Sequence, residues 1–101
     1  MTEAFRIERV DTGHVRVAGV LGFAQASSAF GRVGEVLGGN AGDIAVDVSG
    51  LQKIDSATLA LLLAWAAQAA QRGRNLRLSA VPADLAALAH LCDAESLLGI
   101  A

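Results

Sequence analysis

Several residue types are rare or absent in this 101-residue chain, which has one cysteine, one tryptophan and no tyrosine. Because Cys92 stands alone, the chain cannot form an internal disulfide, which is typical of a protein from a reducing cytosol. Aromatic residues make up 4% of the chain, and the formal net charge is only -2. So small a charge creates no field that would concentrate nucleic acid or anionic lipid head groups. The composition therefore argues against nucleic-acid binding and membrane-surface binding.

The sequence also lacks a hydrophobic run that would span a membrane. Its most apolar stretch, residues 59–67, is about half as long as the ~18 residues that suggest a span. The N-terminal residues contain neither a basic cluster nor an apolar run, so they do not resemble a secretory signal. We therefore expect a cytoplasmic protein. With 53% apolar residues and a mean hydropathy of +0.48, the chain is expected to fold as one domain over residues 1–101.

Motifs for catalysis, metal binding and phosphate binding are missing as well. There is no glycine-rich nucleotide loop after a strand, no Cys-x-x-Cys and no pair of histidines at ligand spacing. His90, Cys92 and Asp93 are close in sequence, but we interpret the first two as a surface histidine and a core thiol that point in different directions. Ser56, His90 and Asp47 supply the residue types of a triad, yet no nucleophile elbow surrounds the serine. We expect no metal, no cofactor and no enzymatic activity.

The hydrophobic pattern of the first half predicts a hairpin followed by a helix. Residues 5–10 and 15–20 alternate apolar with polar side chains around a short polar turn, as paired strands do. Apolar residues at helical spacing then predict a helix over 23–37, although Gly31 and Gly34 weaken its interior.

The second half predicts a strand, helix, strand unit. Short strands at 44–48 and 75–79 flank the strongest helical stretch, at 56–72, and such strands should be parallel. Pro82 then suits the first position of a last helix. An apolar stripe on that helix is expected to face the core: Leu85, Leu88, Ala89 and Cys92. The chain is therefore predicted to be an α/β protein, with a small mixed β-sheet and helices packed mainly on one face.

Polar side chains crowd the start of the helix over 56–72. One explanation for Asp55 and Ser56 is capping, in which one of them accepts a backbone N–H of the first turn. A functional explanation is that a hydroxyl in the first turn is exposed beside the positive end of the helix dipole, where a partner group or a phosphate is favoured. Ser56 and Thr58 are therefore candidate docking or switch residues, next to Asp55.

The faces of this helix suggest where a partner would bind. At about 100° per residue, one face is expected to be buried: Leu59, Leu62, Leu63, Ala66 and Ala70. The opposite side is predicted to face outward: Thr58, Leu61, Trp65, Gln68 and Arg72. Leu61 and Trp65 would then be apolar side chains among polar ones, which is typical of a docking surface. The alternative is that the first helix or the C-terminal segment covers Trp65.

Residues 46–56, VDVSGLQKIDS, and residues 59–62, LALL, resemble the central motif of STAS domains, the family of anti-sigma-factor antagonists. Residues 73–78, GRNLRL, agree with that family too, as do the order of elements and the length. The resemblance covers nearly the whole chain. It implies the STAS fold and a role as a protein-binding switch without catalysis.

Two branches of the family differ at the helix start. Antagonists that a partner kinase phosphorylates resemble Asp-Ser-Ser-Gly-Leu-Gly, and the second serine, which takes the phosphate, is Ala57 here. Gly22 also stands where many antagonists carry an acidic residue. Asp55, Ser56 and residues 59–62 instead resemble Asp-Thr-Gly-Gly-Leu-Ala-Leu-Leu of the MlaB branch, the small STAS subunits of ABC-type phospholipid transporters. In that branch the position of Ser56 is a threonine that contacts the ATPase subunit.

The resemblance therefore implies a regulatory subunit that binds and stabilises the cytoplasmic ATPase of a phospholipid ABC transporter. Such a subunit is cytoplasmic and is held at the inner membrane only through the transporter complex. The alternative is an antagonist that binds an anti-sigma-factor kinase.

Overall fold

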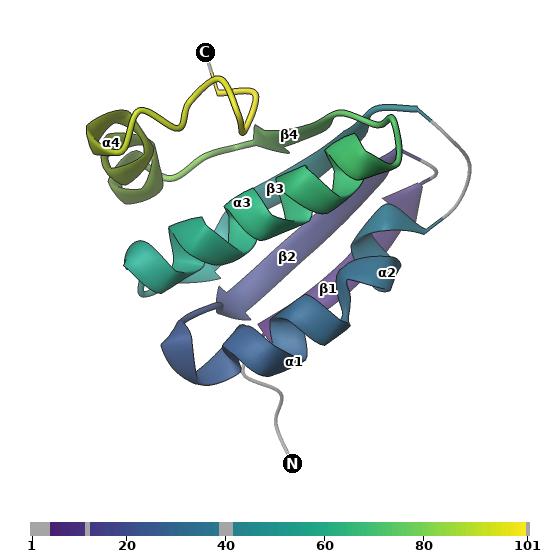
Figure 1. The fold of residues 1–101 in the computed structure, drawn as a ribbon. Coiled ribbons are helices and arrows are strands. Elements are labelled where there is room, and N and C mark those ends of the chain that lie inside the picture. Colours follow the sequence, from purple (N-terminus) through teal and green to yellow (C-terminus); the bar gives the residue numbers. More distant parts are fainter. Residues whose placement is uncertain (1–4, 12, 39–41, 101) are drawn as a thin grey trace.

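The computed structural model describes residues 5–11, 13–38 and 42–100, and they contain a four-stranded mixed sheet (Figure 1). In sheet order the strands are β1 (Phe5–Asp11), β2 (His14–Val20), β3 (Ile44–Gln52) and β4 (Leu76–Ser79). β1 and β2 pair antiparallel, whereas β3 runs parallel to both β2 and β4. The predicted hairpin and the predicted parallel pair are both confirmed.

β3 is longer than the predicted strand over 44–48. The register between β2 and β3 shifts between Asp47 and Gly50, and the strand continues through this irregularity to Gln52. A Cβ on Gly50 would lie 2.8 Å from the Cβ of Ala18. Glycine is therefore needed there because the two strands approach each other closely.

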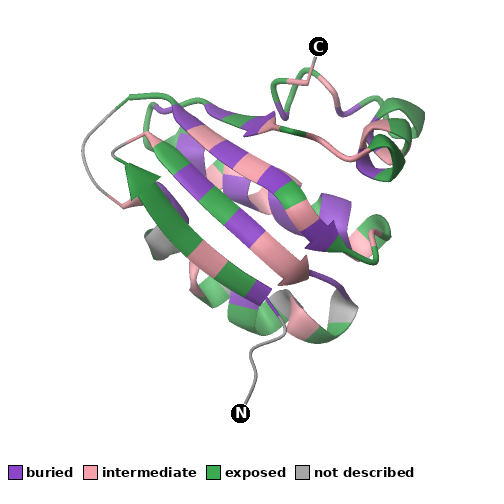
Figure 2. Ribbon diagram, turned by 180° about the vertical axis from the view of Figure 1, so that it is seen from behind, coloured by how far each residue is buried: buried purple, intermediate pink, exposed green. Residues whose placement is uncertain are grey.

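Three helices cover one face of the sheet: α1 (Ala26–Gly31), α2 (Val33–Leu37) and α3 (Ser56–Gln71). The opposite face is open in Figure 2, with no described helix in front of the strands. α4 (Ala83–Leu91) lies beyond β4. In the part of the chain that the structure describes, no helix is long and apolar enough to cross a membrane.

The helix predicted over 23–37 is broken into pieces. A short 3-10 turn, η1 (Phe23–Gln25), precedes α1, and Arg32 separates α1 from α2. Gly31 and Gly34 flank the break, and glycine is a poor helix former because it loses more backbone freedom than other residues. The prediction of a single helix was therefore wrong. The two glycines that were expected to weaken the interior of that helix account for the break.

The C-terminal helix also differs from the prediction in detail. Leu85 and Ala89 are fully buried, as expected, but Cys92 is exposed. α4 ends at Leu91, so Cys92 no longer continues the buried stripe of the helix. The expectation of a core thiol was wrong for this reason. Pro82 precedes α4 as its N-cap residue and not as its first helical residue.

Two arginine side chains, the buried Arg74 and the exposed Arg9, hold the end of α2. Arg74 is 6% exposed and donates hydrogen bonds from Nε to the carbonyl of Gly42, at 3.0 Å, and from Nη1 to the carbonyl of Leu37. Arg9 donates to the neighbouring carbonyl of Val36, at 3.2 Å. Carbonyls at a helix C-terminus have no helical partner, and cations are favoured beside them. Strand β1 and the chain after α3 thereby position α2.

Trp65 is the largest fully buried side chain of the core. It projects from the middle of α3, and its Nε1 donates a hydrogen bond of 3.2 Å to the carbonyl of Ala29 in α1. The bond satisfies the polar atom of a side chain that water does not reach. Trp65 therefore joins α3 to α1.

Trp65→Ala is expected to lower the free energy of unfolding by about 3–5 kcal/mol, because it leaves a large cavity and removes the bond to α1. Urea denaturation measures the loss. Leu91→Ala is the control, since Leu91 is 81% exposed and its removal should cost little. Equal losses for the two variants would contradict a core position for Trp65.

Candidate functional site

α3 begins with a capping box. The Oδ1 atom of Asp55, the N-cap residue, accepts the backbone N–H of Thr58 at 3.0 Å. In return, Oγ1 of Thr58 accepts the backbone N–H of Asp55 at 3.2 Å. These reciprocal bonds satisfy two donors that the first helical turn cannot pair by itself. The capping explanation is confirmed for Asp55, and it includes Thr58 as well.

Thr58 is not a surface residue. It is 1% exposed, and its hydroxyl group donates to Oδ1 of Asp55 at 3.3 Å. Its placement on the outward side of the helix was therefore wrong. A side chain so enclosed, with its hydroxyl held in the capping box, is not available for docking or for transfer of a phosphate.

Ser56 is exposed, in contrast to Thr58. It is the first residue of α3, and its hydroxyl group makes no hydrogen bond with any residue that the structure describes. Asp55, also exposed, performs the capping, so the Ser56 hydroxyl remains available to another molecule. Of the two hydroxyl residues expected at this site, Ser56 alone is accessible.

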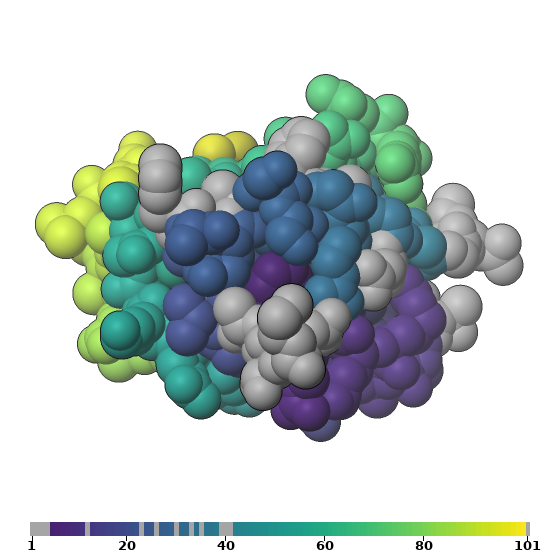
Figure 3. Space-filling model, turned by 90° about the horizontal axis from the view of Figure 1, so that it is seen from below, coloured from purple at the N-terminus to yellow at the C-terminus, as the bar shows by residue number. Residues whose placement is uncertain are grey.

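The segment after β2 lies beside the start of α3, as Figure 3 shows from below. A Cβ on Gly22 would lie 3.6 Å from Oδ2 of Asp55 and 3.4 Å from Oε1 of Gln25, which accepts the Gly22 N–H at 3.0 Å. An acidic side chain at position 22 would bring a second carboxylate close to Asp55, which like-charge repulsion disfavours. Glycine at this position therefore keeps a second carboxylate away from Asp55 at the helix start.

Leu61 and Trp65 were predicted to form an outward docking surface, and this prediction was wrong. Leu61 is 6% exposed and Trp65 is fully buried. Helices α1 and α2 pack against the side of α3 that carries them. Because α3 is apolar on nearly every side, residue spacing alone did not show which side other helices would cover. The alternative expectation, that the first helix covers Trp65, is confirmed.

The side of α3 that faces solvent is different from the predicted one. We call it the alanine face, and it consists of a serine and small or aliphatic residues that are exposed or half-buried: Ser56, Ala60, Leu63, Ala64, Ala67 and Ala70. Leu63 and Ala70 had been assigned to the core. α3 carries no charged residue at all, whereas the outer side of a surface helix usually carries several. The missing charge between Asp55 and Arg72 was visible in the sequence and could have identified this surface.

Two of the side chains considered for catalysis or metal binding, His90 and Asp47, have other hydrogen-bond partners. His90 pairs with Glu95 at 2.8 Å. Asp47 accepts the hydroxyl and the backbone N–H of Ser49, at 2.7 and 2.9 Å, and these bonds hold the pKa of Asp47 below its ordinary value. Neither residue bonds to Ser56. Within the described ranges, no three His, Cys, Asp or Glu residues gather closely enough to hold a metal ion.

Comparison with known proteins identifies a family for the chain. A family model described as Mlab, STAS domain, matches residues 5–99 and so includes every strand and helix of the structure. No curated protein sequence matches the chain. The match includes the helix start and the alanine face.

Asp55→Ala is expected to lower the free energy of unfolding by about 1 kcal/mol, because the first turn of α3 loses its side-chain acceptor. Ser56→Ala should change it by less than about 0.5 kcal/mol, since Ser56 is exposed and bonds to no described residue. Chemical denaturation of both variants measures the difference. A larger loss for Ser56→Ala than for Asp55→Ala would contradict this assignment of the cap.

Proposed function

Because the chain belongs to the MlaB-type STAS domain family, we propose that it is a subunit that binds the cytoplasmic ATPase of an ABC-type phospholipid transporter. Domains of this family generally act without catalysis. The protein would regulate or stabilise the ATPase and would reach the inner membrane only through the transporter complex. The observation that carries the proposal is the uncharged, solvent-facing side of α3, which begins at the free hydroxyl of Ser56.

The start of α3 is well suited to contact a protein. The Ser56 hydroxyl can donate to or accept from a partner without breaking a hydrogen bond to any described residue. The capping box of Asp55 and Thr58 already fixes the first turn, so binding would order little additional backbone. Preorganised polar groups of this kind give an interface its register.

The alanine face extends this contact along the helix. Its small side chains, such as Ala60 and Ala64, let the backbone of a partner approach α3 closely, because the distance between packed helices depends on the side chains between them. Covering an apolar helix surface that would otherwise contact water favours association. This face replaces Leu61 and Trp65 as the proposed docking surface.

The alternative role, an antagonist controlled by a serine kinase, has less support. Ala57 occupies the position of the usual phosphate acceptor, and the neighbouring hydroxyl of Thr58 is buried in the capping box. Ser56 is the one accessible hydroxyl among residues 55–58. A kinase partner would therefore have to use a position one residue earlier than in the antagonists that the chain resembles.

Ser56→Arg is expected to abolish co-purification with the transporter ATPase. A long cation at this position blocks the approach of the partner and opposes the positive end of the helix dipole. Co-expression with the ABC ATPase encoded in the same genome, followed by affinity capture, measures the effect. The matched control is Ala87→Arg, which adds the same cation at an exposed alanine of α4.

Thermal melts of the same proteins separate lost binding from lost folding. Because Ser56 is exposed, Ser56→Arg should melt within a few degrees of the wild type. Undiminished capture of the ATPase by a folded Ser56→Arg variant would contradict the proposed contact.

Incubation with ATP and an anti-sigma-factor kinase from the same genome should leave the protein unphosphorylated, because Ala57 supplies no hydroxyl and Thr58 is enclosed. Intact-mass spectrometry detects a single phosphate as a gain of about 80 Da. Stoichiometric phosphate on Ser56 would instead favour the antagonist role.

A further inference from the structure

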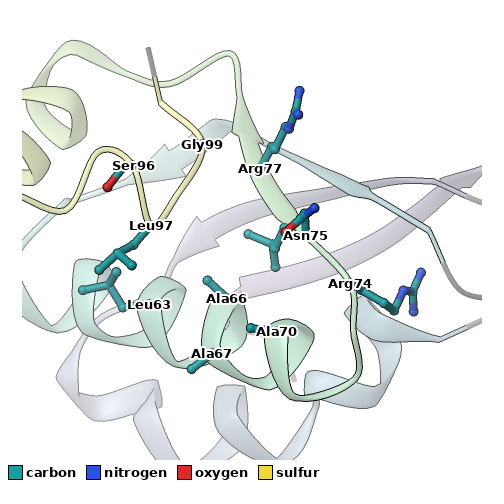
Figure 4. Close-up of a pocket in the computed structure, with 11 residues that line it drawn as sticks. Leu63, Ala66, Ala67, Ala70, Arg74, Asn75, Arg77, Ser96, Leu97 and Gly99 are labelled. Carbon is teal, nitrogen blue, oxygen red and sulfur yellow. The ribbon is translucent and has the colours of Figure 1, made fainter.

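A groove runs beside the second half of α3, between that helix, β4 and the C-terminal segment (Figure 4). Its volume is about 660 Å³. The α3 side is made of Leu63, Ala66, Ala67 and Ala70. Because Leu63, Ala67 and Ala70 also belong to the alanine face, the groove continues the proposed docking surface toward the other end of the helix.

The outer wall of the groove is firmly attached to the domain. The carbonyl of Leu98 accepts the backbone N–H of Leu78 in β4 at 2.9 Å, and the Leu98 side chain is fully buried. Next to it, a Cβ on Gly99 would lie 2.7 Å from Cγ of Arg77, so the C-terminal backbone lies directly on the stem of that arginine. Gly99 also has a φ of +67°, a conformation that glycine adopts without strain. The wall is therefore part of the fold.

Leu97 is the exception within this wall. Ala94 and Leu98, on either side of it in the chain, are buried, yet Leu97 remains 64% exposed. Its side chain and that of Leu63 point toward one another at one end of the groove in Figure 4. Two aliphatic side chains that face each other over a floor of alanines form a site for a large apolar side chain.

The charged side chains that line the groove are all positive. Among its lining residues, the charged ones are Arg74 and Arg77. Arg74 already donates to the carbonyls of Gly42 and Leu37. Arg77 is exposed and makes no hydrogen bond or ion pair within the described ranges of the chain. An apolar groove with a cation available at its rim is complementary to an apolar group that also carries a negative charge.

We propose that this groove binds an amphipathic segment of the ATPase partner, which places a large apolar side chain between Leu63 and Leu97 and a carboxylate beside Arg77. The proposal rests on the proposed function, because it extends the contact that begins at Ser56. A second copy of the chain is a poorer occupant, since two grooves facing each other would bring two Arg77 side chains together. The partner would therefore contact α3 along its whole length.

The experiment measures the affinity of purified variants for the transporter ATPase by biolayer interferometry. Ala67→Glu puts a charge on the apolar floor and should weaken binding at least about tenfold. Arg77→Glu should weaken binding by a similar factor, mainly because the variant associates more slowly with the ATPase. Because salt screens charges, the difference in affinity between Arg77→Glu and the wild type should become smaller at higher salt. Arg77→Lys should recover much of that loss because it keeps the positive charge. The matched control is Ala87→Glu, at an exposed alanine of α4 outside the groove.

The outcomes separate this proposal from the proposed function. If Ser56→Arg abolishes binding while Ala67→Glu and Arg77→Glu bind like Ala87→Glu, the groove proposal is overturned and the contact at the helix start remains. If the wild-type chain does not bind the ATPase, both proposals fail. A wild-type dimer in light scattering that Ala67→Glu dissociates would identify a second copy as the occupant and overturn the proposal. Because Arg77 is exposed, Arg77→Glu provides the test even if Ala67→Glu does not fold.

Discussion

The burial of one side of α3, centred on Trp65, determines which surface this protein presents to other molecules. The sheet and helices α1 and α2 enclose that side, and the hydrogen bond from Trp65 to Ala29 fixes α3 against α1. Once these contacts are made, the remaining side of α3 must face solvent. It carries alanines and no charge. The same packing that forms the core therefore produces an apolar surface outside it.

The helix start divides its polar residues between folding and function. Asp55 and Thr58 bond to each other's backbone and hold the first turn. Ser56 lies between them in sequence, is exposed and bonds to no described residue. This division explains how a helix can keep its cap while offering one hydroxyl group to a partner. The chain belongs to the MlaB-type STAS domain family, whose members generally act without catalysis.

The order of most strands and helices could be predicted from the sequence because the spacing of their apolar residues is regular. Predictions that depended on neighbouring elements were less successful. The helical spacing of α3 was predicted correctly. Which side of α3 is buried depends on how α1 and α2 pack against it, and the residue pattern around Leu61 and Trp65 could not reveal that packing. The break at Arg32 and the continuation of β3 through Gly50 likewise depend on contacts between elements. Asp55 was predicted well because capping is local to the first turn.

Alanine methyl NMR tests the docking surface most directly, since alanines lie on both sides of the molecule. The account predicts that unlabelled ATPase shifts or broadens the methyl signals of Ala60, Ala64 and Ala67 on α3. Ala18 in β2 and Ala45 in β3 lie on the open face of the sheet. Their methyl signals should change much less than those of the three α3 alanines. The account is contradicted if the ATPase perturbs Ala18 and Ala45 most strongly while the α3 methyl signals remain unchanged.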